Sequence, residues 1–242
     1  MEISSQTLDK LRQFDTPTIC NVIELFDIRP YNSGYMDGRI QACFPEMPPM
    51  VGFASTAAFR SGAPAAQGPA YGSFVDQVKS LADLPGPAVM VFEDLDNPAV
   101  AATFGEIMCS TYQAFGSVGL ITSGGGRDLL QVKALGYPVF TAATICAHAY
   151  CQIMHLGLPV RVGGLAVDQG DLLHGDANGV TNIPLEIVAD IADVADEYVA
   201  AEKIIIDYVR SAGPKSIDRL AAARDEFAAA VAQLRVRVKK NR

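Results

Sequence analysis

Phe104-Gly-Glu-Ile-Met-Cys-Ser-Thr-Tyr-Gln-Ala-Phe-Gly-Ser-Val-Gly-Leu-Ile-Thr-Ser-Gly-Gly-Gly-Arg-Asp128 combines a turn, a helix pattern, an apolar strand pattern and a glycine-rich loop within one short stretch. Three consecutive glycines carry a backbone entropy cost that a simple chain reversal does not need. Here residues 124–126 are followed at once by a cation and an anion, Arg127 and Asp128. We interpret this loop as the candidate active site.

Helix and strand patterns alternate on both sides of this stretch. Strands are expected at residues 51–60, 87–93, 118–121 and 138–140, and helical segments at 74–82, 105–115 and 129–135. Further strands are expected at 158–168 and 171–174, around a Gln169-Gly170 turn. This alternation predicts an α/β sandwich, and the closely spaced short strands add a small barrel-like or swivelling β layer.

Both ends of the chain are expected to be helical. Two short helices are predicted within residues 4–26, with Asp15 as a cap and Pro17 at an early helical position. Residues 29–49 are rich in Pro, Gly and Asn and are expected to form a long ordered loop. The predicted organisation is N-terminal helices and loop over 1–49, a core over 50–186, and C-terminal helices over 187–242, split at Gly213-Pro214.

Composition narrows the class of protein. The 242 residues are 50% hydrophobic, which supplies the core of one compact domain. The formal net charge of -8 opposes binding to nucleic acid and to anionic membranes. Five irregularly spaced cysteines and the absence of a secretory pattern favour a reducing cytoplasm. No apolar run reaches the roughly 18 to 20 residues of a membrane span.

The opening stretch contains the groups that an anion site needs. If Glu106 caps the following helix, the amides of Ile107 and Met108 are donors at a positive helix end, ready for a carboxylate or an enolate oxygen. Arg127 adds a fork of donors, and Asp128 offers a hard oxygen ligand for a divalent cation. The alternative is a plain helix-start acid beside a surface ion pair worth less than about 1 kcal/mol.

A second set of polar residues is Cys146, His148, Cys151 and His155. On a helix the last three share one face, which is compatible with zinc, but a buried helix that uses Cys and His as core residues explains the pattern better, and His148 or His155 at the edge of a site is also favoured over zinc. Helical zinc sites normally recruit a carboxylate, and this stretch has none. Asp176-Ala-Asn-Gly179 lacks the acid that closes a calcium loop, so a tight turn at Asn178-Gly179 is expected there.

Several motifs in a consistent order resemble the RraA-like family, which contains the regulator of ribonuclease activity A and the 4-hydroxy-4-methyl-2-oxoglutarate/4-carboxy-4-hydroxy-2-oxoadipate aldolases. These are Gly105-Glu106, Gly124 to Asp128, Pro138-Val-Phe140, Gly163-Gly164, Gly170-Asp171, and the run from Gly175 to Pro184. The resemblance implies an RraA-like catalytic core over 50–186 with a swivelling β/β/α fold, an αββα-type sandwich forming a single domain. It also implies a homotrimer or homohexamer with the site at a subunit boundary.

The aldolase branch of this family implies a divalent-metal-dependent, class II-type lyase that forms pyruvate. Its reactions would be aldol cleavage of 4-hydroxy-2-oxo acids, decarboxylation of oxaloacetate, or both. The resemblance implies that Asp128 holds Mg²⁺ or Mn²⁺, with Glu106 acting partly through water. A glutamate from a neighbouring subunit is typical of this branch, and Glu202 is the best positional match, with Glu197 second.

The same resemblance assigns the substrate-binding groups. Arg127 matches the residue that binds the enolate, and Glu106 the acid after the turn glycine. Gly105, Ile107 and Met108 match the backbone that holds the small 2-oxo acid substrate. A metal ion and a fixed guanidinium stabilise an enolate without a Schiff-base lysine.

The chain departs from the family pattern at Thr122-Ser123, where relatives place an acid before the Arg-Asp pair. Its absence removes a contact that tunes such a site. Two other functions therefore stay open. One is a non-catalytic protein that binds and regulates an RNA-degrading enzyme. The other is a metal-independent lyase or transferase that uses His148 or Cys151.

Overall fold

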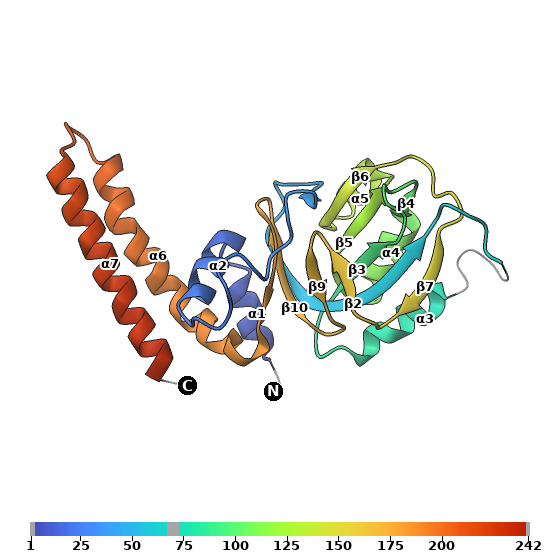
Figure 1. Cartoon of the computed structure of the whole chain (residues 1–242), viewed down its shortest axis with the longest axis horizontal. Coiled ribbons are helices and arrows are strands. Elements are labelled where there is room, and N and C mark those ends of the chain that lie inside the picture. The colour runs from blue at the N-terminus through green and yellow to red at the C-terminus, as the bar shows by residue number, and fades with distance from the viewer. Residues whose placement is uncertain (1–2, 67–72, 241–242) are drawn as a thin grey trace.

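The fold is built on one twisted sheet (Figure 1), seen in a computed structural model that describes residues 3–66 and 73–240. The strands are β1 (Gln41–Ala42), β2 (Met50–Arg60), β3 (Ala88–Asp94), β4 (Ala102–Phe104), β5 (Ser117–Gly126), β6 (Val139–Thr144), β7 (Gln152–Leu156), β8 (Val160–Val162), β9 (Leu165–Val167), β10 (Leu172–Asp176) and β11 (Gly179–Ile183). Within the described residues the main sheet has nine strands, in the order β1-β6-β5-β3-β2-β10-β11. Strand β4 pairs with β5 and β7 with β2, while β8 and β9 form a separate hairpin.

Two long strands change partners along their length. β2 pairs in antiparallel fashion with β10 through residues 50–53 and with β7 through residues 57–60, while β3 lies parallel along its other edge. β5 pairs with β3 up to Thr122 and with β4 at Gly125 and Gly126. The sheet is therefore mixed: β2, β3, β4, β5 and β6 run parallel, whereas the pairs that involve β1, β7, β10 and β11 are antiparallel.

Helices cover the sheet at both ends. They are α1 (Ser5–Leu11), α2 (Thr16–Glu24), α3 (Phe74–Lys79), α4 (Glu106–Ala114), α5 (Leu129–Ala134), α6 (Val188–Arg210) and α7 (Ile217–Lys240), with 3-10 turns at Ser80–Asp83 and Leu185–Ile187. Helices α1, α2 and α6 bury Ile19 and Ile191 against Phe53 of β2. Helices α4 and α5 bury Tyr112 and Val132 at the other end of the sheet. The β8–β9 hairpin packs on the opposite face.

Buried polar contacts fasten the N-terminal helices to the sheet. Asp15 is the N-cap of α2, as predicted, and accepts a hydrogen bond from Thr18 N at 2.8 Å. The Thr16 hydroxyl lies 2.9 Å from Nδ1 of His174, and the Thr16 amide donates to Asp176. Burial lowers the pKa of His174, so its neutral form is favoured. These hydrogen bonds fix the position of α2 relative to β10.

The C-terminal helices form a hairpin that projects away from the sheet (Figure 1). Arg237 of α7 forms a paired contact with Glu197 of α6, at 2.6 and 3.0 Å. Tyr198 and Phe227 meet edge to face with ring centroids 6.3 Å apart. In α6 the buried positions run from Val188 to Ala201, so within the described residues the outer part of α6 contributes no buried side chain to the core.

The predicted α/β class with added terminal helices is confirmed, and a tight turn does join β10 to β11, although it lies at Ala177-Asn178, one residue before the predicted Asn178-Gly179. Two local predictions were wrong, and a helix that was considered for residues 146–155 does not form. Residues 124–126 belong to strand β5 and do not form a loop. Residues 158–168 form the β8–β9 hairpin, which turns at Gly163 and Gly164 with φ of 53° and 79°, values that favour glycine. Residues 146–155 form no helix.

Residues 152–156 instead form strand β7, which pairs with the end of β2. Without β7, the backbone groups at this end of β2 would lack a partner on that edge. Among the described residues, no helix is long and apolar enough to cross a membrane.

Candidate active site

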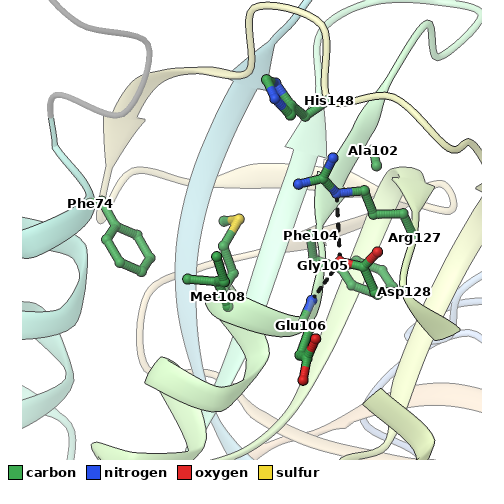
Figure 2. Close-up of a pocket in the computed structure, with 10 residues that line it drawn as sticks. Phe74, Ala102, Phe104, Gly105, Glu106, Met108, Arg127, Asp128 and His148 are labelled. Carbon is green, nitrogen blue, oxygen red and sulfur yellow. Dashed lines mark hydrogen bonds and ion pairs between the residues drawn. The ribbon is translucent and has the colours of Figure 1, made fainter. Parts of the chain in front are cut away.

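The candidate site lies where two neighbouring parallel strands end. β4 leads through Gly105 into α4, and β5 leads through Arg127 and Asp128 into α5. Because parallel strands end at the same edge of a sheet, these segments meet although they are 22 residues apart. They line a pocket of about 480 Å³, together with Phe74, Ala102 and His148 (Figure 2).

Asp128 connects the two segments directly. Its Oδ2 accepts a hydrogen bond of 3.0 Å from the Glu106 amide, the first of α4, and lies 3.7 Å from Nε of Arg127. The N-cap position is Gly105, and Glu106 is the first helical residue. The expectation that Glu106 caps the helix was therefore wrong, because Asp128 satisfies that helix end from across the site.

Gly105 is required by close packing. A Cβ atom there would lie 2.6 Å from Oδ2 of Asp128 and 3.0 Å from Nε of Arg127. Its φ of -158° is ordinary extended backbone, so conformational freedom is not the reason for glycine. The absence of a side chain lets the carboxylate and guanidinium approach the start of α4.

Asp128 adopts a left-handed backbone conformation, with φ 55° and ψ 36°. Aspartate tolerates this region better than most residues, at a cost of about 1 to 2 kcal/mol. The bond to the Glu106 amide and the bond from Arg127 N to Phe104 O, 3.2 Å long, hold the chain in this shape. Such strain beside a pocket is typical of a functional position.

The three glycines at residues 124–126 serve the packing of β5. A Cβ on Gly126 would lie 2.2 Å from the ring of Phe104, and one on Gly125 would lie 2.8 Å from the Ala101 carbonyl oxygen. The glycines therefore let β4 lie directly against β5. The prediction of a loop was wrong because it explained the three glycines by backbone flexibility, whereas they allow close contact between strands.

The two walls of the pocket differ in chemistry. Phe74 and Met108 lie on one side of the Arg127 guanidinium, and His148 lies beyond it, on the side away from Asp128 (Figure 2). The position of Phe74 in the pocket was not predicted, whereas the sequence had allowed His148 or His155 at the edge of a site, and His148 is the one that lines the pocket. Phe74 and His148 come from α3 and from the segment between β6 and β7, so only the tertiary fold places them here.

The predicted glutamates lie in different places. Glu106 is exposed, and its side chain points away from Arg127 in Figure 2. Oε1 of Glu202 lies 3.4 Å from Nδ2 of Asn21, which donates to it, and Glu197 pairs with Arg237. Glu202 and Glu197 belong to α6, which packs at the opposite end of the sheet from α4 (Figure 1). The chain does not bring either of them to its own pocket.

Metal ligation at this site would depend on few protein groups. Across residues 3–66 and 73–240, no group of three or more His, Cys, Asp or Glu side chains could hold an ion. Asp128 is the carboxylate that faces the pocket, with Glu106 beside it. This donor set fits Mg²⁺, which usually keeps several waters and binds through one or two carboxylates plus the substrate.

The cysteines do not form a site within the described chain. Cys146 is exposed and Cys151 is buried, and the helical face that was considered for zinc is not assembled. Cys109 lies under the pocket, and burial, reinforced by the nearby Asp128 charge, raises the pKa of its thiol far above the usual range. A protonated thiol is a poor nucleophile.

A carboxylate does lie near the position where the sequence lacks an acid. Oγ of Ser123 accepts a hydrogen bond of 2.8 Å from the backbone amide of Asp94, at the end of β3. Asp94 is 9% exposed, and burial raises the pKa of its carboxyl from 3.8 to about 6. A Cβ on Gly124 would lie 2.7 Å from Oδ2 of Asp94, so this acid sits against the glycine strand.

The chain belongs to the RraA-like family, because the family model, described as Aldolase/RraA, matches residues 16–181. A protein from Halalkalibacterium halodurans, whose name proposes it as a 4-hydroxy-4-methyl-2-oxoglutarate aldolase, is 33% identical over 101 residues, which are 41% of this chain and 47% of that protein. An uncharacterised protein from Methanocaldococcus jannaschii is 30% identical over 43% of this chain and 50% of its own length. The chain thus spans about half the length of the curated relatives it matches.

Two solved structures share the fold. An uncharacterised protein from Pseudomonas syringae pv. tomato superposes with a TM-score of 0.72 at 22% identity, covering 93% of this chain and 95% of its own. Streptomyces coelicolor RraAS2, described as an unusual member of the RNase ES inhibitor RraA family, superposes with a TM-score of 0.67 at 21% identity over 84% and 96% of the two chains. At these identities the likeness concerns the fold alone.

Proposed function

We propose that this protein is a divalent-metal-dependent lyase that forms pyruvate, by aldol cleavage of a 4-hydroxy-2-oxo acid, by decarboxylation of oxaloacetate, or by both. The observation that carries the proposal is the joint position of Arg127 and Asp128 against the start of α4, inside a pocket large enough for a small dicarboxylic acid. The aldolase name of the Halalkalibacterium halodurans relative is in line with it.

The residues of the pocket suit an enolate. Cleavage of the C3–C4 bond leaves negative charge on the oxygen of the 2-oxo group, and a fixed guanidinium at Arg127 stabilises that charge as it forms. The first-turn amides of α4, at Ile107 and Met108, have no acceptor within their own helix and suit the carboxylate of the 2-oxo acid. Phe74 and Met108 supply an apolar wall that keeps water from the reacting carbon.

Asp128 would hold the divalent ion, with Glu106 contributing through water. When bound, Mg²⁺ or Mn²⁺ supplies Lewis-acid stabilisation of the 2-oxo group. Asp128 already accepts a hydrogen bond from the Glu106 amide and lies 3.7 Å from Nε of Arg127, so its carboxylate is held in one orientation.

Exposed apolar side chains beside the pocket support the proposal that the site is shared between copies of the chain. Ile107 is 78% exposed and Leu130 is 82% exposed, although both are apolar and both lie beside the Gly105 and Asp128 segments. A homotrimer or homohexamer that packs here would cover these side chains. It would also allow a glutamate of another copy, such as Glu202, to reach a pocket that it does not reach in its own chain.

Pyruvate release tests the function. Oxaloacetate and 4-hydroxy-4-methyl-2-oxoglutarate are incubated with the chelator-treated protein, with and without Mg²⁺ or Mn²⁺, and pyruvate is measured with lactate dehydrogenase. We expect turnover that needs the added ion and that falls at least about 100-fold in Asp128→Asn, since that variant loses the ligand charge. The matched control is Asp37→Asn, an acid that pairs with Arg39 away from the pocket. Absence of ion-dependent turnover on both substrates would overturn the proposal.

A second candidate function is the regulation of an RNA-degrading enzyme by direct binding. The observation that favours it is the absence of an acid at position 123. Aldolase relatives place an acid there, whereas Ser123 accepts a hydrogen bond from the backbone amide of Asp94. This function predicts a complex with such an enzyme on gel filtration that persists in Asp128→Asn. A stable complex together with an inactive pocket would favour regulation over catalysis.

A further inference from the structure

The pocket has one apolar wall, formed where α3 lies against α4. Phe74, the first residue of α3, packs against the buried cluster that contains Met108 and Tyr112 of α4. The rings of Phe74 and Tyr112 lie with their centroids 5.7 Å apart and their planes tilted by 60°. Met108 and Tyr112 are four residues apart on α4 and therefore share one face of that helix. Phe74 and Met108 both line the pocket on this side (Figure 2).

Buried contacts hold this wall in place. The hydroxyl of Tyr112 donates a hydrogen bond of 2.6 Å to Oε1 of Gln77, which lies three residues after Phe74 and so on the same face of α3. Tyr112 also meets Phe92 of β3 edge to face, with ring centroids 6.0 Å apart. Tyr112 and Gln77 are fully buried, and Met108 is 8% exposed. The wall is therefore anchored to the sheet and does not depend on a ligand for its shape.

The charged groups of the pocket lie away from this wall. Among the described residues that line the pocket, Arg127 is the one lysine or arginine, and the carboxylates are those of Glu106 and Asp128. Arg127 and Asp128 follow β5 and Glu106 begins α4, so all three come from the strand ends and none from α3. In Figure 2, Phe74 and Met108 lie on one side of the guanidinium and Asp128 on the other. The pocket therefore has a charged end and an apolar side.

These two parts of the pocket suit different parts of a 4-hydroxy-2-oxo acid. All such acids share a carboxylate at C1 and an oxo group at C2, which need the donors of the charged end. They differ in the group that C4 carries, which becomes part of the carbonyl product after cleavage. With C1 and C2 held at Arg127 and the start of α4, the wall of Phe74 and Met108 is the apolar surface available to the C4 group.

A carboxylate and an alkyl group differ strongly in how they fit this wall. A carboxylate placed against a phenyl ring and a thioether loses water without gaining a hydrogen-bond donor, and burial of an unpaired charge is unfavourable. An alkyl group in the same place is favoured, since each buried methylene strengthens binding about fourfold. The pocket volume of about 480 Å³ lies within the range of roughly 300 to 1,000 Å³ that is usual for small-molecule sites, so a longer alkyl chain has room.

Building on the proposed lyase function, we propose that the pocket selects 4-hydroxy-2-oxo monocarboxylic acids with an uncharged alkyl group on C4, and that Phe74 and Met108 determine this specificity. In 4-hydroxy-2-oxopentanoate, the simplest such acid, cleavage breaks the C3–C4 bond. The hydroxyl proton leaves to solvent, and its bonding electrons form the carbonyl of acetaldehyde. The C3–C4 electron pair passes to the pyruvate enolate, which takes up a proton at C3. No other reactant is consumed, so atoms and electrons balance.

A matched pair of substrates tests this selection. 4-Hydroxy-2-oxopentanoate and 4-hydroxy-2-oxoglutarate differ only in carrying a methyl group or a carboxylate on C4, and both release pyruvate, which is measured by chromatography with Mg²⁺ present. We expect kcat/KM to be at least about 10-fold higher for the acid with the methyl group, because its C4 group keeps no charge against the wall. One more methylene, in 4-hydroxy-2-oxohexanoate, should raise kcat/KM by a further factor of about four.

Exchange of the wall residues should reverse the preference. Phe74→Lys places a cation beside the C4 group and should raise kcat/KM for 4-hydroxy-2-oxoglutarate relative to 4-hydroxy-2-oxopentanoate by about 100-fold. Met108→Gln, which keeps the length of the side chain and makes it polar, should shift the same ratio by about 10-fold. Val75→Lys is the matched control, because Val75 is the next residue of α3, is 63% exposed and does not line the pocket. The melting temperature shows that each variant is folded.

The outcomes separate this specificity from the lyase function. Preference for the dicarboxylate, equal use of both acids, or turnover of oxaloacetate alone would overturn the proposed selection and leave the lyase function in place. A second carboxylate bound on the side of His148 would give the first of these results. An unchanged substrate ratio in both folded variants would overturn the role of Phe74 and Met108. Inactivity of the unaltered protein on these acids, on oxaloacetate and on 4-hydroxy-4-methyl-2-oxoglutarate would overturn the lyase function itself, and the selection with it.

Discussion

The two ends of the molecule use side-chain size in opposite ways. At the pocket end, Gly105, Gly125 and Gly126 leave out side chains so that β4, β5 and the Arg-Asp pair can approach one another. At the helical end, large residues such as Ile191 and Leu234 fill the space between α1, α2, α6 and α7. The first end is organised by close backbone contact and the second by apolar burial.

This difference predicts different responses to substitution. At the pocket end, the side chain of Arg127 is 32% exposed and that of Asp128 is 37% exposed. The attraction between these two charges therefore contributes little to stability. Apolar groups at the helical end are nearly fully buried and contribute mainly to stability. Activity and folding should therefore be separable, and four substitutions test this.

Arg127→Ala should produce the largest effect, on activity alone. Loss of the guanidinium that faces the developing enolate should lower kcat for pyruvate release by about 1000-fold, equivalent to about 4 kcal/mol. The melting temperature should stay within about 2 °C, because the side chain makes only a long pair with Asp128. Arg39→Ala, which removes an exposed arginine outside the pocket, is the control. Full activity in Arg127→Ala would contradict the proposed role.

Ile191→Ala should affect stability alone. This side chain is fully buried in the helical core, and its truncation should lower the free energy of unfolding by about 3 kcal/mol and the melting temperature by about 10 °C. Activity per folded molecule at low temperature should be retained. Calorimetry and a pyruvate assay measure the two quantities, with the 80% exposed Ile217→Ala as control. Loss of activity without loss of stability would show that the two ends are coupled.

Gly126→Ala should affect both properties, since it adds a methyl group where two strands touch. The new Cβ would lie 2.2 Å from the Phe104 ring, and relief of that overlap should cost about 2 kcal/mol and displace the end of β4. Denaturant unfolding should report the first effect and pyruvate release the second. Gly38→Ala meets nothing within 4 Å and serves as the neutral control. An unchanged unfolding midpoint would mean that β4 does not need its close contact with β5.

Asp94→Asn should give the smallest effect, one that depends on pH. Because burial raises the folded pKa of this carboxyl from 3.8 to about 6, the folded state holds the proton more tightly than the unfolded state. The unaltered protein should therefore lose stability as pH rises from about 4 through about 6. The variant, which cannot ionise, should be more stable by about 1 kcal/mol at pH 7.5. Urea unfolding at pH 4.5 and 7.5 measures this, with exposed Asp207→Asn as control. A pH-independent difference would contradict it.

Much of the fold could be predicted from local sequence patterns. The alternation of apolar strands with helices indicated an α/β architecture, and Asp15 followed by a proline indicated the start of α2. Strand β4 is only three residues long, too short to show a period, and the five residues of β7 include the polar Gln152 and His155. Both strands exist because β2 and β5 need partners where β10 and β3 end, and that need appears only in the folded sheet.

The candidate site was predictable to the extent that its residues are close in sequence. Gly105 to Met108 and Arg127 with Asp128 were indicated by motifs, and the structure brings them together. The contacts of Phe74 and His148 with this pocket depend on how α3 and the segment after β6 pack, which no local pattern encodes. The run of three glycines at residues 124–126 correctly marked the site because such runs are rare. It was wrongly assigned to a loop, whereas its role is to let β4 pack closely against β5.

Strand β2 connects the pocket end and the helical end of the molecule, because its side chains pack in the cores of both. Its Val51 and Phe53 lie in the helical core, its Ala57 and Phe59 lie in the core beneath the pocket, and its Ala54 faces the hairpin layer. One continuous eleven-residue strand therefore takes part in all three cores. We therefore expect the two ends to unfold together as one cooperative unit, and we expect that no cut within β2 would release a pocket fragment able to fold by itself.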